Sequence, residues 1–156
     1  MISANSHTEP VHHGRIELDS YADKIVFGRN WAVIHFIERE CDVSPYTDAY
    51  EPIKSVKIAF AGTAWTSPAS GETYILVFNK GLWMGNKMDH TLVNPNQMCH
   101  FGIKVQDNPY DNGPLYLMTE DGDFELPLTV QGTNIMEDTR TLTEEELQTC
   151  NQTTLS

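Results

Sequence analysis

The chain has 156 residues, 40% of them hydrophobic and 21% charged, which is enough for one domain with an apolar core. It carries 22 Asp and Glu against 10 Lys and Arg, a formal net charge of −12. So acidic a surface repels nucleic-acid phosphates and anionic lipids, and direct nucleic-acid binding is not expected. No stretch has the pattern of a signal peptide or a membrane span, so we expect an intracellular, cytoplasmic protein without membrane contact.

The cysteines and histidines do not form a recognisable metal or disulfide pattern. Cys41, Cys99 and Cys150 are odd in number and widely spaced, which argues against a disulfide scaffold. The adjacent His12 and His13 have no matching pair of ligands at the spacing of a zinc finger. We therefore expect no metal and no cofactor.

The first half of the chain favours strands. Residues 1–13 are polar and without periodicity, so they are predicted to be a flexible lead. Five runs rich in β-branched and aromatic residues are predicted as strands: 14–18, 24–27, 31–38, 53–65 and 73–78. The connection 66–72 contains Pro68 and Gly71 and is typical of a β-hairpin.

The second half has clearer local signals. A turn is predicted at 81–86, and short strands are predicted at 103–105, 115–118 and 124–130. Asn94 as N-cap, Pro95 in the first turn and Gly102 as a stop predict a helix over 95–101. Thr143 and Glu146 make a capping box that predicts a second short helix near the end.

These elements predict a mostly β fold, a small closed barrel or a sandwich with one or two short peripheral helices. We place one β domain at 14–136, followed by a short helix and polar tail at 137–156. No internal repeat indicates a second domain.

Asp19 is the strongest candidate for catalysis. An apolar strand delivers this acid, and a hydroxyl (Ser20) and a small residue (Ala22) follow it. Two carboxylates held about 3 Å apart can hydrolyse an amide, because they share one proton and act together as base and acid. The chain offers one such loop, so the pair requires a symmetric dimer. Ser20 would brace the two loops against each other. A plain Asp–Ser turn at a strand end is the alternative interpretation.

Several segments together resemble one protein family. They are residues 18–23, 27–31, 41–46, 51–53, 63–65, 71–78, 82–83, 88–97 and 144–150. Their order and spacing resemble the retropepsin-like aspartic protease segment of copia-type LTR retrotransposon polyproteins. The likeness covers nearly the whole chain after about residue 14.

The resemblance implies a retropepsin-like half-barrel that dimerises and cleaves the element's own polyprotein. It implies catalytic Asp19 with Ser20 beside it, and a substrate-binding role for Tyr21 and Ala22. It also implies a hairpin that closes over the substrate, with its tip at Ser67–Gly71 and with Ala61, Gly62, Thr63 and Ala64 lining its inner leg. Tyr21 stands where the general Asp-Ser/Thr-Gly motif has glycine, and its ring occupies space that glycine leaves for substrate.

Two other functions stay open at this point. Tyr21 could close the cleft and leave a catalytically inert dimerisation or structural module of a polyprotein. An unrelated small-ligand-binding β-barrel would instead be a monomer with an accessible interior cavity.

Overall fold

The computed structural model describes residues 11–20, 24–43, 53–110 and 113–156, and this part of the chain contains twelve strands and two helices. The strands are β1 (His13–Leu18), β2 (Val26–Gly28), β3 (Ala32–Val43), β4 (Ile53–Thr66), β5 (Thr73–Gly85), β6 (Thr91–Val93), β7 (Lys104–Gln106), β8 (Tyr116–Met118), β9 (Glu125–Pro127), β10 (Thr129–Gln131), β11 (Asn134–Arg140) and β12 (Asn151–Thr154). The helices are α1 (Pro95–Phe101) and α2 (Glu144–Thr149). The predicted mostly β fold is confirmed.

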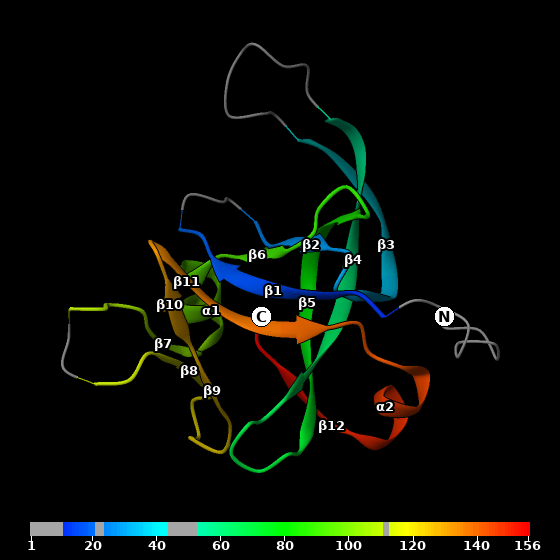
Figure 1. The fold of residues 1–156 in the computed structure, drawn as a ribbon. Coiled ribbons are helices and arrows are strands. Elements are labelled where there is room, and N and C mark those ends of the chain that lie inside the picture. The colour runs from blue at the N-terminus through cyan, green and yellow to red at the C-terminus, as the bar shows by residue number, and fades with distance from the viewer. Residues whose placement is uncertain (1–10, 21–23, 44–52, 111–112) are drawn as a thin grey trace.

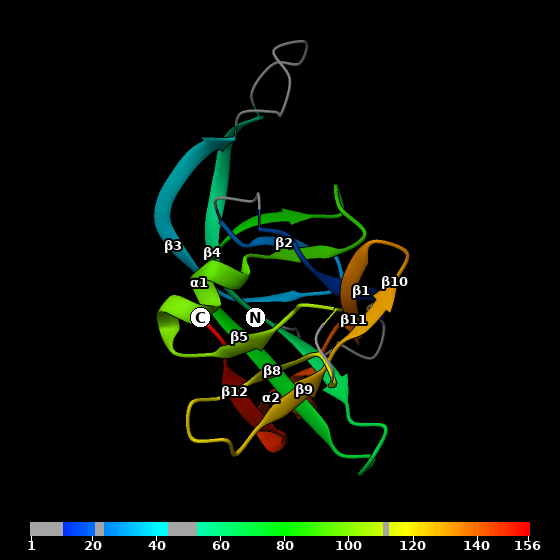
Figure 2. The ribbon, with the colours of Figure 1, turned by 90° about the vertical axis from the view of Figure 1, so that its left-hand side faces the viewer.

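Most strands join one curved sheet with the order β10-β11-β1-β6-β2-β5-β4-β3. Arg140 of β11 also pairs with Ala64 of β4, so the strands between them form a ring (Figure 1). β12 lies parallel to β5, and β7, β8 and β9 make a separate small sheet that Figure 2 shows in front of β5. The topology confirms the strand-rich architecture.

The β4–β5 hairpin agrees with the sequence, but β5 is longer than predicted. It continues through Gly81 to Gly85, so the turn predicted at 81–86 is wrong for most of its length. The cause is a long-range contact, because a Cβ on Gly81 would lie 2.4 Å from a ring carbon of Phe27. Gly81 therefore lets the strand pass close to an aromatic ring.

Three aromatic side chains fill the centre of the core. Phe27, Trp31 and Phe78 are at most 2% exposed. Their ring centroids lie 5.1 Å apart for Phe27–Trp31 and 5.0 Å apart for Trp31–Phe78. Tilted rings at this spacing are favourable pairs, and each buried ring contributes roughly 1.5–3 kcal/mol through removal from water.

Both predicted helices are present, with the predicted caps. The Asn94 side chain accepts from the N–H groups of Asn96 and Gln97, and Gly102 ends α1 in a left-handed conformation. Thr143 and Glu146 form the reciprocal capping box of α2. No helix of the described residues is long and apolar enough to cross a membrane.

The C-terminal region is more regular than the predicted helix and polar tail. β11 runs across the boundary placed at 136/137, and residues 151–154 form β12. Leu155 is fully buried in the main core. At the other end, residues 1–10 of the predicted lead lie outside the described residues, and β1 begins at His13.

Candidate active site

Asp19 follows directly after β1, as the sequence predicts. β1 and β6 are parallel neighbours, with Leu18 opposite Val93. The backbone N–H of Asp19 donates to the carbonyl oxygen of Val93 at 2.9 Å. Asp19 is half-buried and Ser20 is exposed. The backbone of the candidate catalytic residue is therefore fixed to β6, while the following hydroxyl faces solvent.

The strand that holds Asp19 leads at once into α1. Val93 is fully buried, Asn94 caps the helix, and Met98 on the helix is fully buried as well. Asn94 Oδ1 lies 2.8 Å from the Asn96 nitrogen. A cap of this kind contributes about 1 kcal/mol to a helix. The cap and the buried Met98 side chain thus fix the end of β6 next to Asp19.

A buried polar network, which we call the Asn30 network, ties β6 to β1 and β11. It consists of Asn30, Thr63, Thr91 and Thr139, all at most 4% exposed. The Asn30 amide nitrogen donates to the Arg15 carbonyl at 3.3 Å and to Thr139 Oγ1 at 2.8 Å. Asn30 Oδ1 accepts from the Thr91 hydroxyl at 3.1 Å.

The same network reaches two further segments. Thr91 Oγ1 accepts from the backbone N–H of Gly28 at 2.9 Å. Thr63 Oγ1 donates to the Asn30 carbonyl at 2.9 Å. The Arg15 carbonyl can only accept, so the Asn30 amide has one possible orientation. Sequence reasoning missed this network, because nothing near Asn30 in the chain indicates that it meets residues 61 and 109 positions away.

An apolar cluster begins on the strand that follows the Asp19 loop. Its buried members are Val56, Ile58 and Leu82, and its partly buried members are Val26, Ile37 and Met84. Val26 lies opposite both Leu92 of β6 and Leu82 of β5. One strand, β6, lies between Val26 of this cluster and the strand β1 that precedes Asp19. The sequence analysis did not identify the cluster.

The other predicted site residues lie elsewhere. Ala61 and Thr63 are fully buried. Gly62 is buried too, where a Cβ would lie 3.2 to 3.3 Å from the side chains of Leu142, Ile34 and Ile75. These three residues pack the protein interior and do not line an open surface. Gly71 is exposed, with φ of 74° at the hairpin tip.

The structure does not bring that tip to Asp19 within one chain. The end of the β4–β5 hairpin lies at the bottom of the molecule in both views, whereas the end of β1 lies well above it (Figures 1 and 2). The pairing agrees, since Arg140 joins β4 to the His13 end of β1, away from Asp19. Tyr21 and Ala22 lie outside the described residues.

One surface cleft, of about 350 Å³, lies over the first half of β1. It is lined by His13, Gly14, Arg15, His90, Asp138 and Thr139. Arg15 lies opposite Asp138 in the sheet and pairs with Glu17. Asp19 is not among the lining residues. Within the described ranges, no group of three His, Cys, Asp or Glu side chains is arranged to hold a metal ion.

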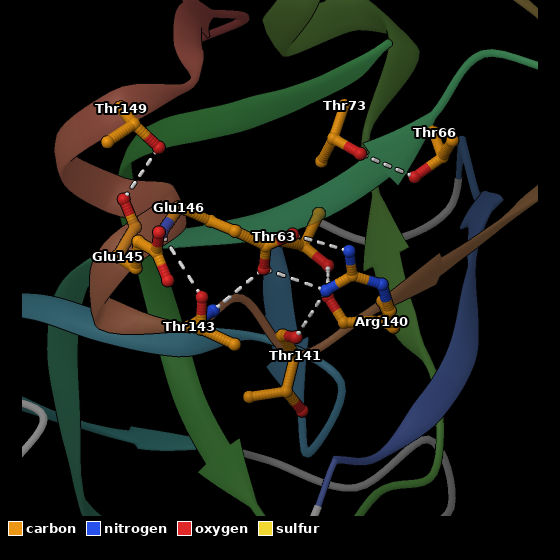
Figure 3. A network of polar contacts seen from close by, with 9 residues as sticks. All are labelled: Thr63, Thr66, Thr73, Arg140, Thr141, Thr143, Glu145, Glu146 and Thr149. Carbon is orange, nitrogen blue, oxygen red and sulfur yellow. Dashed lines mark hydrogen bonds and ion pairs between the residues drawn. The ribbon is translucent and has the colours of Figure 1, made fainter. Parts of the chain in front are cut away.

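Two carboxyl groups, one on β11 and one on α2, have pKa values shifted from their ordinary values. Burial raises the pKa of Glu137, whose Oε2 accepts from Trp65 Nε1 at 3.0 Å. Hydrogen bonding to Arg140 lowers the pKa of Glu146. Arg140 contacts Glu146 through both terminal nitrogens, at 2.8 and 2.5 Å (Figure 3). This bidentate pair fastens α2 to β11.

Comparisons with protein-family models, with curated proteins and with solved structures found no match to this chain.

Proposed function

We propose that the chain is a retropepsin-like aspartic endopeptidase that processes a copia-type retrotransposon polyprotein as a homodimer. The observation that carries the proposal is the placement of Asp19. This acid ends a strand, its backbone N–H is bonded to Val93, and the capped helix α1 begins two residues after Val93. The sequence resemblance of the segments around Asp19 and around residues 88–97 supports the same assignment.

The chemistry follows from two such acids. Asp19 of each chain would lie about 3 Å from its counterpart, and two carboxylates at that distance share one proton. The ionised carboxylate takes a proton from water, which attacks the peptide carbonyl, and the protonated carboxyl donates to the departing amine. Ser20 is exposed beside Asp19, where it can bond to the loop of the second copy.

The substrate is an extended polypeptide. Val26, on the strand after the Asp19 loop, and the partly buried Ile37 and Met84 are the side chains of the apolar cluster that would contact an apolar substrate residue. Because Ala61, Gly62 and Thr63 are buried, contacts with substrate would not come from these three residues.

The test combines mass in solution with cleavage of an unbiased peptide pool between about pH 4 and 7, because the pH dependence of cleavage reports on the catalytic acid and base. Wild type is compared with Asp19→Asn and with Asp123→Asn, which removes an exposed carboxylate from a loop. We expect a dimer whose cleavage disappears in Asp19→Asn and persists in Asp123→Asn. Cleavage that survives in Asp19→Asn refutes the proposal.

The remaining outcomes identify the alternatives. Dimers that cut nothing, but cut after Tyr21→Gly, would indicate an inert module closed by the phenol ring. Monomers that cut nothing would indicate a ligand-binding barrel.

A further inference from the structure

We infer that Thr91 is a positioning residue for Asp19, and that it acts by holding β6 through its hydrogen bonds to Gly28 and Asn30. The inference rests on the proposed function for its kinetic readout, but it also predicts a property of the Asp19 backbone that is independent of activity. The link is a short chain of contacts. Thr91 begins β6, and Val93, two residues further, accepts the hydrogen bond from Asp19.

The Thr91 hydroxyl has two hydrogen-bond partners, and these bonds connect β6 to the segment 28–30. It accepts from Gly28 N–H at 2.9 Å and donates to Asn30 Oδ1 at 3.1 Å. Thr91 is fully buried, so water cannot replace either bond. Only glycine fits at position 28, because a Cβ there would lie 2.2 Å from the carbonyl oxygen of His90, so the two backbones are in close contact. In addition to its backbone pairing with β1 and β2, β6 is thus held by the side chain of its first residue.

Thr139 provides a matched comparison on the other side of Asn30. It is 4% exposed and accepts from the Asn30 amide at 2.8 Å. Its strand, β11, pairs with β1 at Gly14 opposite Thr139, five residues before Asp19. Losing this hydroxyl leaves a buried donor unsatisfied, as losing Thr91 does, but it removes no bond to β6, and β11 stays paired with β1 and β10.

The experiment compares Thr91→Val, Thr91→Ser and Thr139→Val with wild type. Valine keeps the shape of threonine and removes the hydroxyl, whereas serine keeps the hydroxyl. Peptide cleavage is measured for each as kcat and KM, with near-UV circular dichroism as the check that each variant is folded. We expect Thr91→Val to lower kcat by about tenfold or more with KM nearly unchanged, because small misplacement of a catalytic group is costly. Thr91→Ser restores kcat, and Thr139→Val keeps it within about twofold.

Hydrogen exchange of the Asp19 amide gives the second readout. The Asp19 N–H is bonded to Val93, so its protection reports the contact between β1 and β6. We expect Thr91→Val to speed this exchange by about tenfold relative to Thr139→Val. Equal exchange in the two folded variants overturns the inference, as does an equal loss of kcat in both.

The two readouts separate this inference from the proposed function. If wild type cuts no peptide, or if Asp19→Asn still cuts, the protease proposal fails and the exchange measurement alone decides the role of Thr91. If wild type cuts and Thr91→Val behaves like Thr139→Val, the protease proposal stands and the positioning role is refuted.

Discussion

Two polar networks meet at Thr63, and they stabilise the fold in different ways. The Asn30 network is neutral and at most 4% exposed, and it ties together β1, β2, β4, β6 and β11. The second, which we call the Arg140 network, consists of Arg140, Thr141, Thr143 and Glu146 and fastens α2 (Figure 3). Its ion pair is partly exposed, with 27% of the Arg140 side chain and 19% of the Glu146 side chain accessible.

The difference in burial and charge determines which substitutions and which solution conditions weaken each network. Buried neutral hydrogen bonds do not respond to pH or salt. When one partner of such a bond is removed, however, the other is left without a hydrogen bond in a site that water does not reach. A partly exposed ion pair is screened by water and salt, so its loss costs less and depends on pH. We therefore expect substitutions in the Asn30 network to cost more stability than substitutions in the Arg140 network, although only the latter contains charged groups.

The largest effect is expected from Asn30→Ala. The change removes the bonds to Arg15, Thr139 and Thr91 at once and leaves a small cavity. We expect a loss of about 3 kcal/mol or more in the free energy of unfolding, measured by urea denaturation. Asn134→Ala, at an exposed asparagine that starts β11, is the control and should cost less than about 0.5 kcal/mol. A loss below about 1 kcal/mol for Asn30→Ala would contradict the importance of this network.

Thr63→Val breaks the junction between the two networks. The Thr63 hydroxyl lies 2.9 Å from the Asn30 carbonyl oxygen and 2.8 Å from the Arg140 carbonyl oxygen, in a fully buried position, and these two acceptors share its one proton. We expect a loss of about 2 kcal/mol, with most of it recovered in Thr63→Ser. Urea denaturation of both variants gives the comparison, and a serine variant as unstable as the valine variant would mean that packing of the methyl group dominates.

The Arg140 network and Glu137 supply opposite pH dependences. The folded-state pKa of Glu146 is lowered by Arg140, so its contribution is present above the unfolded value of about 4.5 and is lost as the pH falls through the folded value. Glu146→Gln should therefore cost about 0.5–1 kcal/mol at neutral pH and little at about pH 3.

Burial raises the folded-state pKa of Glu137, so its contribution to stability depends on pH in the opposite direction. The native state then takes up this proton before the unfolded chain does, so stability rises as the pH falls from the folded pKa towards about 4.5. Glu137→Gln keeps an acceptor for Trp65 and should stabilise by about 0.3 kcal/mol at neutral pH. Urea denaturation of Glu146→Gln and Glu137→Gln at neutral pH and at about pH 3 measures both effects. Changes of the same sign in the free energy of unfolding of the two variants at neutral pH would refute the opposite pKa shifts.

The sequence predicted those parts of the fold that depend on neighbours in the chain. Asn94, Pro95 and Gly102 mark both ends of α1, and Thr143 with Glu146 marks the start of α2, because caps are local interactions. The strand that precedes Asp19 was also predicted from neighbouring residues, because its residue types favour a strand locally.

The parts that depend on distant contacts could not be predicted in this way. β12 has the polar sequence Asn-Gln-Thr-Thr and is a strand only because β5 lies beside it. The burial of Gly62 depends on Leu142, and the separation of Gly71 from Asp19 depends on the ring of strands. The Asn30 network joins residues up to 109 positions apart, which no local pattern reports.

The smallest effect is expected at the far end of the β4–β5 hairpin. Thr66 and Thr73 lie opposite each other, and their hydroxyls are 2.8 Å apart in an exposed position. Water can replace this bond, unlike the bonds of Thr63 and Thr91, so the same Thr→Val change should have a different cost. We expect Thr66→Val to lose only about 0.2–0.5 kcal/mol, and a double-mutant cycle with Thr73→Val to give a coupling of that size. A coupling as large as the loss in Thr63→Val would show that burial does not govern the difference between the two regions.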